Sequence, residues 1–314
     1  MKTMPLGFTG VEVSALCLGT MQFGTKNDRA TSYQMLDQYT GAGGTFLDTA
    51  NGYAHWLIEN GQGGESETLL GEWMRERGNR DQLFIASKVG FGYPGADRGL
   101  KAEQIEAECE KSLKRLGIET IDLYYAHKDD YDTPLEETMQ AFDKLVQAGK
   151  VRFIGASNYF SWRLEEAHWS SITNDWAEYC CLQQRYSYLR PGPRASLGNH
   201  VLATEDIFDY AQRRNITVLA FSAMLGGVFT RSDRPLRAEY AGPDSDARLK
   251  ALNEVAQETG ATPSQIVLAW MLHSTPAVLP LISASTPETM QDNLGALDVS
   301  LSDDQMERLN TAGA

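Results

Sequence analysis

The chain has 314 residues, of which 42% are hydrophobic and 22% charged, a composition typical of a globular protein with a sizeable core. Its formal net charge of −14 argues against a nucleic-acid partner, which would need a basic surface, and against binding to an anionic membrane. No apolar run approaches the roughly eighteen residues that a membrane-spanning helix needs.

The start of the chain and its cysteines give no sign of export or of a metal site. The opening residues, MKTMPLGFTG, lack the apolar segment of a signal peptide. Cys17, Cys109, Cys180 and Cys181 show no metal-ligand spacing, and the last two are adjacent, which makes a poor disulfide. We therefore expect a cytoplasmic protein with reduced thiols and no bound metal.

Short apolar runs recur along the chain, and several are continuous, as in strands that are buried on both faces of a parallel sheet. Before the first of them, MPLGFTGVEVS resembles a short hairpin. The predicted strands cover residues 15–19, 45–48, 83–87, 121–126, 151–156, 180–183, 216–221 and 278–282.

Amphipathic helices are predicted between these strands. Apolar residues fall on one helical face in 105–116 and again in 135–146, and we interpret both stripes as core-facing. Three Thr-Pro pairs have the pattern of an N-cap followed by proline in the first helical turn. They begin at Thr133, Thr262 and Thr286.

Eight strands alternating with helices predict a (β/α)8 TIM barrel, here a single domain over residues 1–314 with a short N-terminal β-hairpin. A doubly wound sheet would give the same alternation. However, no G-x-G-x-x-G follows any predicted strand, so the Rossmann fingerprint is absent.

Polar residues follow most of the predicted strands, where packing does not explain them. The active site of a (β/α)8 barrel lies at the C-terminal ends of its strands. Asp48 is at the end of the second predicted strand, Lys88 follows the third and His127 follows the fourth. Later strand ends carry Ser157, Asn158, Gln183, Phe221 and the run Ser283 to Ser285.

Asp48, Tyr53, Lys88 and His127 form a unit that can move a proton. A lysine beside a carboxylate stays charged, and its charge would lower the pKa of a neighbouring phenol from about 10. Such a phenol can protonate a carbonyl oxygen, and His127 could orient that oxygen. Each residue alone also has a structural interpretation. The aspartate could form a turn, the tyrosine could pack in the core, the lysine could be solvated, and the histidine could be a buried structural residue. Their positions after consecutive predicted strands favour the functional interpretation.

At this point the chain resembles the aldo-keto reductase family over nearly its whole length. The resemblance implies a barrel that binds a nicotinamide cofactor without a Rossmann domain, with Asp48, Tyr53, Lys88 and His127 as catalytic residues and Tyr53 as acid/base. The segments that carry it are GGTFLDTANGY (43–53), GGESETLLGEWM (63–74), FIASKVG (84–90), SLKRLGIETIDLYYAH (112–127), TPLEETMQAFDKLVQAGKVRFIGASNY (133–159) and PLISASTPETMQDNLGAL (280–297).

The resemblance also implies residues for each part of the cofactor. Ser157, Asn158 and Gln183 would bind the nicotinamide carboxamide, and Phe221 would stack on its ring, where other members often have Tyr or Trp. The pyrophosphate would lie along Ser222, Met224, Leu225 and Gly226. The adenosine end would lie near Ser283, Ser285, Thr289, Asp292 and Asn293.

One departure from the family concerns the cofactor's 2′-phosphate. Many members place Lys or Arg in the segment matching 283–289, whereas no Lys or Arg occurs here from Ala251 to Glu307. Without a cation the phosphate loses its charge-assisted contacts, so we weight NADP(H) and NAD(H) equally. Arginines after the seventh predicted strand could fold over and restore the charge; they are Arg231, Arg234, Arg237 and Arg248.

A second departure is the long loop after Tyr53, AHWLIENGQGGESE. It is either a surface excursion or a pocket wall in which Trp56 forms a hydrophobic plate, suited to a sugar-like carbonyl compound. Segments 188–200 and 226–246 are rich in Arg, Gly and Pro, and we expect them to cover the site.

These observations predict an NAD(P)(H)-dependent oxidoreductase that acts on a small carbonyl or alcohol substrate. The alternative is a cofactor-binding regulatory barrel with little turnover. A metal hydrolase is a weaker third hypothesis, since His127 alone of the five histidines follows a predicted strand. A monomer is the default oligomeric state.

Overall fold

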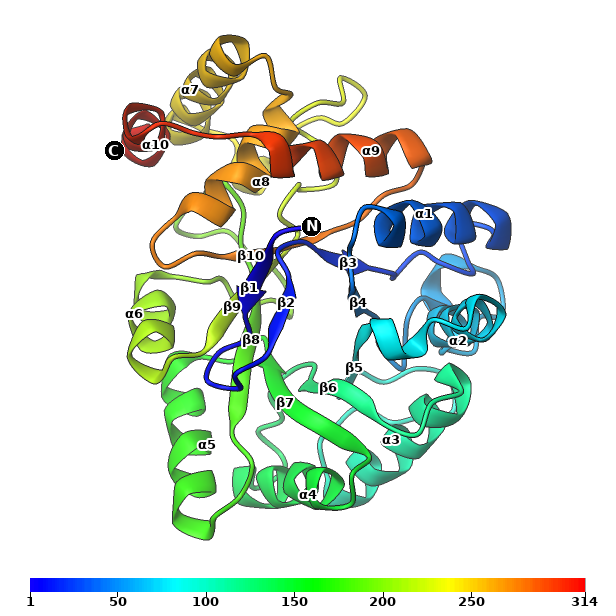
Figure 1. The fold of residues 1–314 in the computed structure, drawn as a ribbon. Coiled ribbons are helices and arrows are strands. Elements are labelled where there is room, and N and C mark those ends of the chain that lie inside the picture. The colour runs from blue at the N-terminus through cyan, green and yellow to red at the C-terminus, as the bar shows by residue number, and fades with distance from the viewer. Residues whose placement is uncertain (314) are drawn as a thin grey trace.

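A computed structural model describes residues 1–313, and eight parallel strands in it close into a barrel (Figure 1). Each strand pairs with the next along the chain, and β10 closes the ring by pairing with both β9 and β3. This confirms the (β/α)8 prediction and rules out the doubly wound sheet. The barrel strands are β3 (Cys17–Gly19), β4 (Phe46–Asp48), β5 (Phe84–Val89), β6 (Ile121–Ala126), β7 (Val151–Ser157), β8 (Tyr179–Arg185), β9 (Thr217–Phe221) and β10 (Leu279–Ile282).

The predicted N-terminal hairpin is also present. β1 (Thr3–Pro5) pairs antiparallel with β2 (Glu12–Ser14). Leu6 and Val13 are buried in the same cluster as Cys17 and Phe46 inside the barrel, so the hairpin closes the end of the barrel at which the strands begin. The opposite end, where the strands finish, is left for loops.

Helices surround the barrel, mostly one between successive strands (Figure 1). None of those described in residues 1–313 is long and apolar enough to cross a bilayer. The helices are α1 (Arg29–Gly41), α2 (Glu65–Arg77), α3 (Ala102–Leu116), α4 (Leu135–Gln147), α5 (Ser161–Asn174), α6 (Glu205–Arg214), α7 (Pro243–Thr259), α8 (Pro263–His273), α9 (Pro287–Gly295) and α10 (Asp303–Thr311).

The Thr-Pro signals predict two of three helix starts. Thr262 and Thr286 accept hydrogen bonds from backbone amides in the first turns of α8 and α9, as N-caps do. The prediction that Thr133 caps α4 is wrong. Pro134 has φ −53° and ψ 128°, so α4 begins one residue later, and the Thr133 hydroxyl donates to Asp130 at 2.7 Å.

Alternation along the strands decides which residues reach the centre of the barrel. Successive side chains of a strand point to opposite faces, so every second residue points inward. The interior is filled by apolar residues near the start of the strands, among them Phe46, Phe84, Leu123, Cys181 and Leu219. Residues two or four positions further along each strand therefore face inward at its C-terminal end.

Candidate functional site

The inward positions at the C-terminal ends of the strands hold the polar residues singled out in the sequence. Asp48 is two residues after Phe46, Lys88 four after Phe84, and His127 four after Leu123. Gln183 and Phe221 follow Cys181 and Leu219 by two. Lys88 and Ser157 lie within strands rather than after them, because β5 and β7 extend further than predicted, and Gln183 lies inside β8 rather than at its end.

Asp48 and Lys88 form an ion pair in which neither residue is exposed to solvent. The Lys88 Nζ also donates to the carbonyl oxygen of Thr49 at 2.8 Å, and Gln183 Nε2 donates to the second Asp48 oxygen at 2.8 Å. A buried charge needs partners of this kind. In the structure, Asp48 is therefore paired with Lys88.

Tyr53 lies within reach of the same ammonium. Lys88 Nζ is 3.3 Å from the Tyr53 hydroxyl oxygen and 4.8 Å from the centroid of its ring. The turn that follows β4 holds the ring there, since the Tyr53 amide donates to the carbonyl oxygen of Ala50 at 3.2 Å. Tyr53 as a whole is half-buried, in contrast to the fully buried Asp48 and Lys88.

Burial governs the protonation of this group of residues. Burial raises the pKa of Asp48, against the opposing effect of Lys88. Burial alone would lower the pKa of Lys88, but the Asp48 charge and the contact with Tyr53 hold it above its ordinary value. Burial also raises the pKa of Tyr53 by more than Lys88 lowers it. The predicted lowering of the Tyr53 pKa is therefore wrong, and the hydroxyl is protonated at neutral pH.

His127 lies beside this phenol as a neutral imidazole. Its ring centroid is 5.6 Å from that of Tyr53 and 4.6 Å from that of Phe91. Burial, the charge of Lys88 and the neighbouring His200 lower the pKa of His127 well below its ordinary value. A neutral imidazole still carries one N–H, which can donate to a substrate oxygen.

The three residues expected to bind the nicotinamide carboxamide lie together, but they differ in which of their hydrogen-bonding groups are already paired. They are Ser157, Asn158 and Gln183. The Asn158 side chain donates to His127 O at 3.0 Å and to Ser157 Oγ at 3.1 Å, and it accepts from the Val201 amide at 3.2 Å. Among residues 1–313, Gln183 Oε1 accepts no hydrogen bond, and the Ser157 hydroxyl donates none. The pair thus offers one donor and one acceptor, while Asn158 mainly holds the two neighbouring loops.

The model of the aldo/keto reductase family matches residues 15–314. The chain belongs to the aldo/keto reductase family.

Several relatives of this aldo/keto reductase are named as oxidoreductases, and the chain is accordingly an oxidoreductase. It is 32% identical to norsolorinic acid reductase stcV of Emericella nidulans, over 95% of this chain and 77% of the relative. It is 31% identical to the uncharacterized oxidoreductase YrpG of Bacillus subtilis, over 97% of this chain and 94% of the relative. It is 29% identical to aryl-alcohol dehydrogenase [NADP(+)] of Phanerodontia chrysosporium, over 96% of this chain and 83% of the relative.

Aldo/keto reductases use NADP(H) or NAD(H), and the end of β9 offers features that fit such a cofactor. Ser222 and Leu225 have positive φ angles of 57° and 47°, an uncommon backbone for such residues that occurs often at ligand sites. In the described part of the chain, the amides of Met224 and Gly226 donate to no other group. A Cβ at Gly226 would meet nothing within 4 Å, so this turn is open to a ligand. Free amides and open space suit an anionic phosphate.

The residues assigned to the adenosine end of the cofactor differ in their exposure and in their hydrogen bonds. Ser283, Ser285 and Thr289 line the connection from β10 into α9 and have some exposure. Asp292 accepts from the Thr262 hydroxyl at 2.9 Å, and Asn293 donates to Ser283 O at 3.0 Å. Asp292 and Asn293 therefore help to hold the local fold, whereas within residues 1–313 the side chains of the first three residues have no such bond to another element.

The arginines expected to restore a positive charge differ in their surroundings. Arg231 packs against Gly227 but makes two hydrogen bonds to Asp233, which also lies 4.0 Å from Arg234. Arg248 is buried in α7, where it donates to Tyr188 O at 3.1 Å. Arg248 is thus committed to packing, and Arg231 is paired with a neighbouring acid.

Two aromatic residues of the site escaped the sequence analysis. Phe91 contacts His127, and the His200 ring lies 5.1 Å from the ring of Phe221. Phe91 comes three residues after Lys88, so its position near a strand end was a usable signal. His200 is brought in by the long segment after β8, and nothing local in the sequence indicated this.

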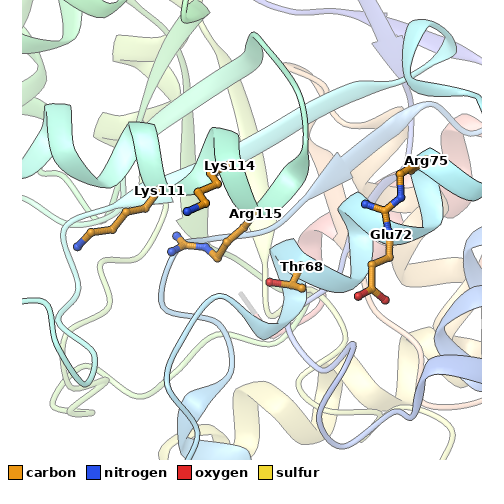
Figure 2. A pocket seen from close by; sticks show the side chains of 6 residues that line it. All are labelled: Thr68, Glu72, Arg75, Lys111, Lys114 and Arg115. Atoms are coloured by element: carbon orange, nitrogen blue, oxygen red, sulfur yellow. The ribbon is translucent and has the colours of Figure 1, made fainter.

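Hollows on the outer wall of the barrel are separate from these strand ends. A groove of about 480 Å³ runs between α2 and α3, and another of about 500 Å³ between α3 and α4. No three His, Cys, Asp or Glu side chains of residues 1–313 are grouped as metal ligands. Figure 2 shows the residues that line the first groove, which are Thr68, Glu72 and Arg75 of α2 and Lys111, Lys114 and Arg115 of α3.

Proposed function

We propose that this enzyme interconverts carbonyl compounds and alcohols, with Tyr53 as general acid in reduction and general base in oxidation. The contact of Tyr53 with the buried Lys88–Asp48 pair carries this proposal. A bound nicotinamide supplies the hydride to the carbonyl carbon. The Tyr53 hydroxyl gives its proton to the carbonyl oxygen, and the Lys88 ammonium stabilises the phenolate that remains.

The other residues of the site have supporting roles in this proposal. His127 donates its single N–H to the carbonyl oxygen and so aligns it with the Tyr53 hydroxyl. The Ser157 hydroxyl and Gln183 Oε1 match the acceptor and the donor of a nicotinamide carboxamide. Phe221 supplies an apolar face for the ring, and the open amides of Met224 and Gly226 are suited to the pyrophosphate.

The test is turnover of the wild type and of Tyr53→Phe with a panel of aldehydes and ketones and both reduced cofactors. We expect the variant to lose about 10² to 10⁴ in kcat, because it keeps the ring but has no proton to transfer. Cofactor binding, measured by fluorescence titration, should not change. A wild type that binds cofactor but reduces nothing would instead support the regulatory subunit.

We further propose that the preferred substrates are aromatic carbonyl compounds rather than sugars. The Tyr53 ring packs edge-to-face with Trp56 at 6.2 Å and with His127 at 5.6 Å, and Phe91 extends the cluster beyond His127. Trp56 itself is 54% exposed, so its ring is available to a ligand. Edge-to-face and offset contacts are the ones that aromatic rings prefer. One relative is named as an aryl-alcohol dehydrogenase, which supports the same class.

Replacing Trp56 tests this substrate class. We expect Trp56→Ala to lower kcat/KM for benzaldehyde by about three- to tenfold, the worth of one aromatic pair, and to leave kcat/KM for butanal unchanged. The matched control is Trp162→Ala, which removes an equally exposed tryptophan from α5. An equal loss for both aldehydes, or no loss, would count against an aromatic wall.

A further inference from the structure

The turn that carries Tyr53 is tied to the outer helix α3 by one buried carboxylate. Glu108 is 6% exposed, and its Oε2 accepts from Asn51 Nδ2 at 2.7 Å and from the Tyr93 hydroxyl at 2.7 Å. Its Oε1 accepts from Lys111 Nζ at 2.7 Å. Lys111 is one of the three α3 residues that line the outer groove in Figure 2. Three donors from different segments thus meet on a single side chain.

Asn51 connects this carboxylate to the candidate catalytic residues. It is two residues before Tyr53, and its backbone amide donates to the carbonyl oxygen of Lys88 at 3.1 Å. Its side chain reaches outward to Glu108 and is 1% exposed. The start of the Tyr53 turn is therefore held from two sides, by β5 through Lys88 and by α3 through Glu108.

Tyr93 connects the same carboxylate to the far end of the loop. A Cβ at Gly52 would lie 3.5 Å from the Tyr93 ring, and one at Gly63 only 2.5 Å from it. The ring thus lies against both ends of the loop that contains Trp56, and its hydroxyl is fixed on Glu108. A side chain at Gly63 would push the ring away.

The protonation states keep the hydrogen bonds to Glu108 in place at neutral pH. We call Glu108 with its bonds to Asn51, Tyr93 and Lys111 the clamp. Burial alone would raise the pKa of Glu108, but the bonds from Lys111, Tyr93 and Asn51 outweigh it and lower the pKa. Burial and the nearby Glu108 raise the pKa of Tyr93 to about 12. At neutral pH, Glu108 therefore only accepts hydrogen bonds, and Tyr93 donates one.

We propose that Glu108 is a positioning residue, which holds Tyr53 in place through Asn51 and closes the Trp56 loop through Tyr93. This inference rests on the proposed role of Tyr53 as the proton donor. Its consequence is that an outer-helix carboxylate, which does not touch the substrate, controls the rate of the chemical step.

The variant Glu108→Gln tests this. The amide replaces one acceptor oxygen by an NH2 group, which then faces a donor, so the clamp loosens while the side-chain volume stays the same. The measurement is a single-turnover reaction, in which enzyme preloaded with reduced cofactor is mixed with an aldehyde that the wild type reduces. We expect the hydride-transfer rate constant to fall about ten- to a hundredfold. The amplitude and the nucleotide Kd should stay at their wild-type values.

The readouts separate positioning from a merely structural role. A structural role would lower the amplitude, which counts folded enzyme, and leave the rate constant unchanged; this result would overturn the inference. The control Glu106→Gln makes the same change at an exposed position of α3 and should match the wild type. If Glu108→Gln does not fold, Tyr93→Phe keeps the ring, removes one donor and should still slow hydride transfer; a wild-type rate constant would overturn the inference.

Failure of this inference is distinguishable from failure of the proposed function. If Tyr53→Phe retained wild-type turnover, the acid role of Tyr53 would be wrong and the clamp would lose its purpose. If Tyr53→Phe is inactive while Glu108→Gln keeps the wild-type hydride-transfer rate constant, the clamp alone is refuted.

Discussion

The buried Lys88 ammonium uses all three of its hydrogens. They point to Asp48, to the carbonyl oxygen of Thr49 and to the Tyr53 hydroxyl. Removing two charges from water costs several kcal/mol per ion, and a buried pair returns that energy only when its hydrogen bonds are complete. Such a pair is weak as a source of stability. We infer that it is present for the proton chemistry at Tyr53.

This reasoning predicts that a double substitution at the ion pair lowers the free energy of unfolding less than a single one. Asp48→Asn leaves the Lys88 ammonium buried without a counter-ion, so we expect the free energy of unfolding to fall by about 3–5 kcal/mol. Asp48→Asn combined with Lys88→Met removes both charges and should recover most of that loss, while neither variant reduces aldehydes. Urea unfolding measures the stabilities. A double variant as unstable as the single one would show that the pair itself stabilises the fold.

At the scale of elements, α2 and α3 pack against each other on the outside of the barrel, beside the loop that contains Tyr53. Gly71 of α2 faces the end of α3, and a Cβ there would lie 2.5 Å from Arg115 O and 2.7 Å from Leu116 O. The buried Glu67 of α2 accepts from Arg115 Nε at 2.6 Å and from the Ser87 hydroxyl of β5. The two helices are thus joined to each other and to the strand that carries Lys88.

The close helix contact can be tested with two alanine substitutions. Gly71→Ala should lower stability by about 1–3 kcal/mol, because backbone carbonyl groups cannot move aside as a flexible side chain can. Gly41→Ala, at the end of α1, meets nothing within 4 Å and should be neutral or stabilising by up to about 1 kcal/mol. Thermal unfolding followed by circular dichroism compares the two. Equal melting temperatures would contradict the close packing of α2 on α3.

For the whole molecule, the charge distribution bears on the choice of cofactor. The net charge is −14, and the stretch from Ala251 to Glu307, which includes α9, has no Lys or Arg. Asp233 pairs with Arg231, which packs against Gly227 in the turn after β9. A 2′-phosphate at the start of α9 would therefore find hydroxyl groups and amides rather than a cation.

Ligand-induced stabilisation tests this expectation on the intact protein. A ligand at a hundred times its Kd stabilises the folded state by about 2.7 kcal/mol. We expect NAD⁺ and NADP⁺ at equal concentrations to raise the melting temperature by similar amounts, since no cation distinguishes them. A rise with NADP⁺ alone, lost on adding salt, would show that an arginine reaches the phosphate after all.

Much of the site was predictable because strands impose a strict alternation. Once the strands are placed, Asp48, Lys88 and His127 must face inward at the same end of the barrel, and apolar runs mark those strands in the sequence. The turn that carries Tyr53 has no such periodicity; the chemistry of a phenol close to Asp48 and Lys88 pointed to this residue, and the family resemblance implied the same acid/base role. Thr262 and Thr286 were predictable as caps for a similar reason, because capping is a local interaction.

By itself, the sequence determined the order of strands and helices and the polar residues at the strand ends, since these follow from local periodicity. Closure of the sheet was decided by the structure, because a doubly wound sheet has the same alternation of strands and helices. The tertiary structure alone decided the raised pKa of Tyr53, the use of Asp292 to hold α8, and the approach of His200 to Phe221. Each of these depends on burial, or on contacts between segments far apart in the chain, which a local pattern does not encode.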